Sequence, residues 1–158
     1  MNAVSNSSPL IALAAIERLV LLPLLFDSVI IPPAVAFETR RTIPARPAWL
    51  YVRSLQNQLP AAVLRPTLGD GEREAIALAL EASADRVVLD DLPARRVAQE
   101  LGLNVIGTLG LLLAAKRAGL VDAIRPELDN LVRTGFFLGQ QLYEEVLRAA
   151  GEFASLAD

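Results

Sequence analysis

VSNSSPLIALAAI, residues 4–16, changes character twice within a few positions. A short β-compatible start leads into four small polar residues at 5–8, and a long apolar run begins after Pro9. Serine is favoured at a helix N-cap and proline at the first helical position. The stretch therefore predicts a strand over 3–5, a tight turn, and a helix with Ser8 at its N-cap.

The same alternation of strand and helix continues along the chain. Short β-branched runs between turn residues predict strands at 28–31, 86–89 and 104–106. Helices are predicted near 33–38, from 69–72 onward, at 94–101 and at 107–118. Strands and helices that alternate with short links form a parallel sheet covered on both faces. We therefore expect a three-layer α/β/α sandwich.

The segments between and after these elements give weaker patterns. We expect a short helix over 18–26, a loop over 39–47, a helix around 49–55, a brief strand at 62–64, and extra C-terminal helices over 121–133 and 140–150. The length of 158 residues is typical of one domain, so 1–158 is expected to fold as a single domain.

Composition excludes several kinds of chemistry. The chain has no histidine and no cysteine, which removes Ser-His and Cys-His nucleophiles, thiolate metal sites and ordinary zinc ligation. The apolar run 9–26 contains Glu17, Arg18 and Pro23, so it does not resemble a membrane span of about 20 uninterrupted apolar residues. It also lacks the basic start of a signal peptide. A cytoplasmic protein is expected, with chemistry based on carboxylates, hydroxyls, amides, arginines or a bound ion.

Carboxylates recur where predicted strands end or where neighbouring helices begin. In open α/β sheets ligands bind beyond the carboxyl ends of the strands, near the point where strand order reverses. The polar residues that this rule brings toward one edge are Asn6, Glu38, Glu72, Glu74, Asp90 and Asp91. A set of oxygen ligands without histidine or cysteine suits Mg²⁺ or Mn²⁺, and such an ion can activate water against a phosphate ester.

Each acid also has a purely structural interpretation. Glu72 or Glu74 would complement a helix dipole in a first turn. Asp90 and Asp91 would form a turn and an N-cap, and Glu38 would lie on a solvated helix face. Taken singly, none of these positions distinguishes a metal site from a cap.

The order and spacing of the whole set are more specific. VSNSSPLIALAAIERLVLLPLLFDSVIIPPAV, then GDGEREAIALALEASADRVVLDD, then ARRVAQELGLNVIGTLGLLLAAKRAGL resemble the PIN-domain superfamily, and within it a VapC-like group often classed as a domain of unknown function. The likeness extends to the tail RPELDNLVRTGFFLGQQLYEEVLRAAGE. It implies an α/β/α fold, often dimeric, and a Mg²⁺- or Mn²⁺-dependent ribonuclease that in many bacteria is a toxin neutralised by an antitoxin.

The resemblance also assigns roles to residues. It implies catalytic, metal-binding positions at Glu38, at Glu72 with Glu74 as a substitute, and at Asp90 helped by Asp91. Thr108 and Ser7 fall where a hydroxyl supports the site. The first acid of the family pattern falls on Asn6, an amide that can still coordinate a cation but brings no charge.

Three hypotheses follow. The first is a metal-dependent, toxin-like ribonuclease that cuts RNA with a metal-activated water and pairs with an antitoxin and a second copy. Its candidate phosphate contacts are Arg40, Arg41, Arg46, Arg95 and Arg96, which could equally be solvated surface or antitoxin contacts. The second is a catalytically weak or silent PIN-like domain that binds RNA or protein, because of Asn6. The third is a small α/β protein whose carboxylates are all caps.

Overall fold

The centre of the molecule is a five-stranded sheet. The structure is a computed structural model that describes residues 1–153. Its strands are β1 (Asn2–Ser5), β2 (Ser28–Ile31), β3 (Leu50–Val52), β4 (Arg86–Val88) and β5 (Val105–Ile106). They lie in the order β3-β2-β1-β4-β5, and every pairing is parallel. The predicted parallel sheet is confirmed.

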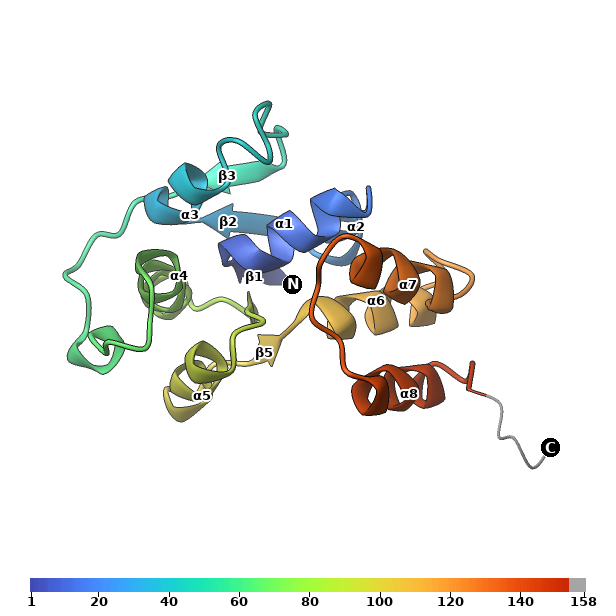
Figure 1. The fold of residues 1–158 in the computed structure, drawn as a ribbon. Helices are drawn as coiled ribbons and strands as arrows, with labels where there is room; N and C mark the ends of the chain where they lie inside the picture. Colours follow the sequence, from blue (N-terminus) through green and yellow to red (C-terminus); the bar gives the residue numbers. More distant parts are fainter. Residues whose placement is uncertain (154–158) are drawn as a thin grey trace.

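Helices lie on both faces of this sheet (Figure 1). They are α1 (Ser7–Ala15), α2 (Leu21–Leu25), α3 (Pro33–Glu38), α4 (Asp70–Glu81), α5 (Leu92–Glu100), α6 (Thr108–Arg117), α7 (Arg125–Arg133) and α8 (Gln140–Ala149), with a 3₁₀ turn η1 at Ala61–Val63. The predicted three-layer α/β/α fold with extra C-terminal helices is therefore also confirmed.

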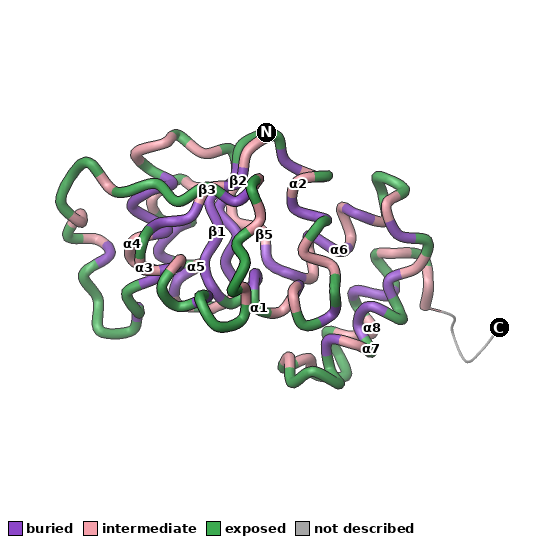
Figure 2. Tube along the Cα trace, turned by 90° about the horizontal axis from the view of Figure 1, so that it is seen from above, coloured by how far each residue is buried: buried purple, intermediate pink, exposed green. Residues whose placement is uncertain are grey.

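Alternating strand residues divide the core in two. Ala3 and Val88 belong to a cluster with the leucines of α1, α2, α6, α7 and α8, whereas Val4 and Val87 belong to a second cluster with α4 and α5. Successive side chains of a strand point to opposite faces, so the central strands β1 and β4 each supply both clusters. Figure 2 shows these strands as the buried centre of the molecule.

The strand order also defines where a ligand can bind. From β1 the chain continues outward through β2 and β3, and it then returns to the other side of β1 with β4 and β5. The reversal lies between β1 and β4, where the Asn6 backbone N–H donates to the Val88 carbonyl across 3.0 Å. The carboxyl ends of these strands thus form the expected ligand-binding edge.

The start of the first helix differs from its prediction. Helix α1 begins at Ser7, with Asn6 in the N-cap position and no side-chain cap bond, so Ser8 is not the N-cap. Pro9 lies inside the first turn, where the backbone N–H groups have no intrahelical partner and a missing one costs nothing. The chain therefore turns two residues earlier than predicted, directly at the end of β1.

Two other local predictions are wrong. Residues 49–55 do not form a helix, because Leu50–Val52 pair in parallel with Val29–Ile31 as edge strand β3. The strand predicted at 62–64 is replaced by η1, which is buried through Val63 against the second cluster. In both places tertiary pairing or packing decides the backbone conformation. No helix in the described residues is long and apolar enough to cross a membrane.

Candidate functional site

The first part of the site joins the ends of β1 and α3. Asn6 follows β1 directly and is only 3% exposed, and Ser7 is the first residue of α1. The Ser7 hydroxyl donates to Glu38 Oε1 across 2.6 Å. Glu38 is the last residue of α3, which follows β2. Two of the predicted positions, Asn6 and Glu38, therefore lie together, and the predicted supporting residue Ser7 joins them. Asn6, Ser7 and Glu38 form one corner of the candidate site.

Gly71 explains how this corner stays open. A Cβ atom at Gly71 would lie 1.9 Å from Glu38 Oε1 and 3.1 Å from Asn6 Oδ1. Any side chain there would force the Glu38 carboxylate to move. Sequence reasoning missed this residue as part of the site. Its only signal was a glycine in the first turn of a helix, which is unfavourable by propensity.

The second part of the site lies at the end of β4. Asp90 accepts two hydrogen bonds from one residue, the first amino acid of α6: Thr108 N donates to Oδ1 at 2.8 Å and Thr108 Oγ1 donates to Oδ2 at 2.6 Å. Thr108 is fully buried. Thr108 therefore orients the Asp90 carboxylate, consistent with the supporting role implied for it.

The other three predicted acids bond to backbone groups. Glu72 Oε2 accepts from the Gly69 N–H at 2.6 Å, which makes Glu72 part of the cap that starts α4. Asp91 is the N-cap of α5 and accepts from the Ala94 N–H at 3.1 Å. Glu74 accepts from the Ala34 N–H at 3.2 Å and so links α4 to the start of α3. The contacts of Glu72 and Asp91 match the structural interpretation of acids at helix starts, whereas Glu74 lies beyond the first turn of α4 and bonds to another helix.

The described residues contain no group of three or more acidic, histidine or cysteine side chains close enough to hold a metal ion. The expected converging set of Glu38, Glu72 and Asp90 is thus not assembled as one cluster. Asn6 Oδ1 and Glu38 Oε1 nevertheless both lie within 3.1 Å of the point that a Gly71 Cβ would occupy. Mg²⁺ is commonly held by one or two protein carboxylates and keeps several waters. The donor chemistry at this corner therefore fits a hard, oxygen-bound cation.

The predicted arginines divide into two groups. Arg95 lies at the Asp90 end of the site, where its Nη1 donates to the Leu89 carbonyl across 3.0 Å. Arg96 is exposed on the same helix. Arg40 bonds to the Phe37 carbonyl and lies 3.7 Å from the centre of the Phe37 ring, and Arg41 and Arg46 are exposed in the following loop. Only Arg95 is held directly beside a predicted site carboxylate.

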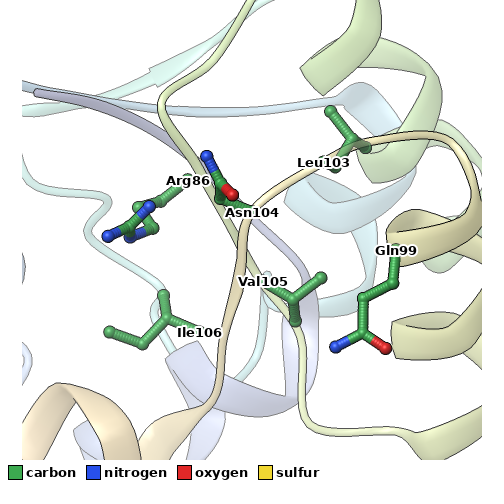
Figure 3. Close-up of a pocket in the computed structure, with 6 residues that line it drawn as sticks. All are labelled: Arg86, Gln99, Leu103, Asn104, Val105 and Ile106. Atoms are coloured by element: carbon green, nitrogen blue, oxygen red, sulfur yellow. The ribbon is translucent and has the colours of Figure 1, made fainter.

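A cavity of about 430 Å³ lies at the edge strand β5 (Figure 3). It is lined by Arg86, Gln99, Leu103, Asn104, Val105 and Ile106. None of the predicted site residues lines it. A second cavity, of about 570 Å³, does include Asp90 and Arg95 together with apolar side chains from α6, α8 and the α7–α8 connection. The cavity beside the Asp90 carboxylate is therefore this second one.

Fold and site together define a class of protein. It is a three-layer α/β protein with a parallel sheet, and carboxylates and an amide lie where the strand order reverses.

Residues 2–152 match the PIN-domain family, so the chain belongs to that family. Members of the family are usually nucleases that use divalent metal ions. In solved structures the chain is similar to a PilT N-terminus domain protein from the archaeon Sulfolobus solfataricus P2. The identity is 22% and the TM-score 0.52, over 73% of this chain and 93% of that one. No curated protein matches the chain.

Proposed function

We propose that this protein is a Mg²⁺- or Mn²⁺-dependent ribonuclease that hydrolyses RNA phosphodiester bonds in the cytoplasm. The observation that carries the proposal is the corner at which Asn6, Ser7 and Glu38 meet, kept open by the absence of a side chain at Gly71. Membership of the PIN-domain family supports a nucleic-acid substrate.

Each residue has a distinct task in this proposal. Glu38 and Asn6 hold the cation through their side-chain oxygens. The Ser7 hydroxyl donates to Glu38 Oε1 and thereby orients the carboxylate beside Asn6 Oδ1. When bound, the divalent ion lowers the pKa of a water and neutralises charge on the phosphate. Asp90, fixed by Thr108, supplies a second carboxylate at the neighbouring strand end.

A cleavage assay with matched variants tests the proposal. Glu38→Gln and Asp90→Asn should each reduce Mn²⁺-dependent cleavage of a mixed single-stranded RNA by at least about 100-fold, the scale of losing a principal catalytic group. Glu145→Gln and Asp122→Asn are the matched controls, because both acids are exposed and lie outside the site. Equal activity in all four variants would reject the assigned roles of Glu38 and Asp90.

A catalytically weak or silent RNA- or protein-binding domain is the second candidate. Two observations favour it: an amide stands where the family pattern has an acid, and the described residues hold no cluster of three acids. The Asn6→Asp variant separates the candidates. Cleavage that appears only in Asn6→Asp supports a silent natural protein, whereas cleavage by the natural protein that is lost in Asp90→Asn supports the enzyme.

The same proposal has three parts that rest on the family resemblance. The protein acts as a toxin, an antitoxin protein neutralises it, and it forms a homodimer. Expression of the natural protein should arrest bacterial growth, and expression of Asp90→Asn should not. Co-expression of a small DNA-binding protein encoded next to this gene should restore growth. Sedimentation of the purified chain measures whether it is a dimer.

A further inference from the structure

The cavity beside Asp90 is lined by two chemically different kinds of residue. Asp90 and Arg95 are charged, and most of the others are apolar, among them Phe136, Phe137 and Leu142. Its volume of about 570 Å³ lies within the range of small-molecule sites, roughly 300–1,000 Å³. We call it the Asp90 cavity. It continues directly from the proposed catalytic carboxylate.

Two apolar residues that line the Asp90 cavity are strongly exposed. Phe137, in the connection between α7 and α8, is 93% exposed, and Leu92, at the start of α5, is 63% exposed. Phe136, the residue before Phe137, is half-buried against the core and anchors the connection between α7 and α8. Large apolar side chains gathered on one surface mark a binding site more often than an accident of folding.

The two charged residues of the Asp90 cavity, Asp90 and Arg95, both lie beside Gly107. A Cβ atom at Gly107 would lie 2.6 Å from Arg95 Nη1 and 2.9 Å from Asp90 Oδ1, so glycine leaves the space between the cation and the carboxylate open. Arg95 donates one N–H to the Leu89 carbonyl. A guanidinium has five N–H donors. Arg95 therefore retains donors for an anionic group, and the guanidinium fork matches the geometry of a phosphate.

We propose that the Asp90 cavity binds an unpaired nucleobase next to the reacting phosphate, with Phe137 as the stacking surface and Arg95 as the phosphate contact. The proposal rests on the proposed nuclease function and adds to it a subsite for one base. An aromatic ring and a cation that line the same cavity match one nucleotide, whose base is flat and apolar on its faces and whose phosphate is anionic. Bases in a duplex are stacked on each other and cannot reach Phe137.

Stacking is tolerant of sequence because every base has a π-face. The cavity should therefore select unpaired over paired RNA and discriminate weakly among bases. Phe137→Ala should raise KM, or the Kd for single-stranded RNA, with a smaller effect on kcat, because Phe137 contacts a base and not the reacting phosphate.

The test measures binding of a short single-stranded RNA that carries the fluorescent base 2-aminopurine, in EDTA so that no cleavage occurs. The natural protein should quench the fluorophore. Phe137→Ala should lose the quenching and bind at least about fivefold more weakly, a low value for the loss of one base–aromatic stack. Phe137→Tyr should restore both. Val132→Ala is the matched control, because Val132 is 48% exposed and does not line the cavity.

Three results would overturn the proposal. The first is unchanged affinity and quenching in Phe137→Ala, and the second is an equal loss of affinity for fully paired RNA. The third is conversion of a dimer to a monomer by Phe137→Ala in sedimentation, which would assign the cavity to a second copy of this chain. Since quenching is measured without metal, a natural protein that binds but never cuts would reject the nuclease function and leave the base site standing.

Discussion

Ser7 and Glu38 are joined by a hydrogen bond of 2.6 Å, although 31 positions separate them in the chain. The bond ties the first residue of α1 to the last residue of α3, and thereby the ends of β1 and β2. It is the only connection among the described residues that orients the Glu38 carboxylate through a side chain. Several consequences of this corner can be measured.

Ser7→Ala removes the donor that orients Glu38. We expect the free energy of unfolding in urea to fall by about 1 kcal/mol, below the usual 1.5–3 kcal/mol for a bond to a charged group because Glu38 is exposed. The rate of Mn²⁺-dependent cleavage should fall by a larger factor than the equilibrium constant for folding. Ser8→Ala is the control, since Ser8 is exposed on the same helix turn. Similar losses in both variants would show that the serines act only on the helix.

Gly71→Ala tests whether the open corner is needed. Alanine is a better helix former than glycine by about 1 kcal/mol, so propensity alone predicts a more stable protein. A Cβ at position 71 would lie 1.9 Å from Glu38 Oε1, so the exposed, flexible Glu38 side chain must turn away and lose its hydrogen bond from Ser7. That loss, about 1 kcal/mol, should offset the gain in helix propensity and leave the free energy of unfolding in urea nearly unchanged, while Mn²⁺ binding becomes weaker.

A double-mutant cycle gives this prediction its control. In a Glu38→Ala background the clashing carboxylate is absent, and Gly71→Ala should stabilise the protein by about 1 kcal/mol in the same urea titration. Additive effects would mean that Gly71 and Glu38 do not interact.

Asn6→Asp places a carboxylate in a buried position near Glu38. Without metal, repulsion and burial of charge should lower the melting temperature. With Mn²⁺ the added charge should tighten binding, so the rise in melting temperature at millimolar Mn²⁺ should exceed that of the natural protein. Asn104→Asp, at an exposed amide before β5, is the matched control. An equal Mn²⁺ response in all three proteins would remove Asn6 from the cation site.

The sequence predicted the elements whose signals are local. Ser28–Ile31 is a β-branched run stopped by two prolines, and it forms β2 with the predicted bounds. The helix with Val35 and Glu38 follows it as predicted. Strand β3 was missed because three residues become a strand only by pairing with β2, a contact 21 positions away. Local propensity does not contain that information.

The candidate site shows the same division. That Asn6, Glu38 and Asp90 follow neighbouring strands could be read from the order of the elements. Glu72 turns back to cap its own helix. The sequence offered this only as one of two interpretations, because a glutamate in a first helical turn fits a helix cap and a metal ligand equally well. Gly71 was unpredictable, since its importance arises from the position of another element's carboxylate.

Glu152 links the C-terminal segment to helices α6 and α7. Its carboxylate accepts from Lys116 Nζ and the Ile124 N–H, both at 2.7 Å, and from the Arg125 N–H at 3.1 Å, so it caps the start of α7. Burial raises the pKa of Glu152, but these hydrogen bonds and the Lys116 charge outweigh it, and the pKa lies below its ordinary value of 4.5. The ionised form is therefore favoured by folding.

Because the folded-state pKa of Glu152 is lowered, its contribution to stability is complete above about pH 4.5 and is lost as the pH falls through the folded-state value. Glu152→Gln should destabilise the protein at pH 7 and should make the free energy of unfolding less dependent on pH below 4.5. Glu145→Gln, an exposed glutamate of α8, should leave the pH dependence as it is. Urea titrations between pH 3 and pH 7 measure both. Parallel pH profiles for the natural protein and Glu152→Gln would show that another carboxylate controls acid unfolding.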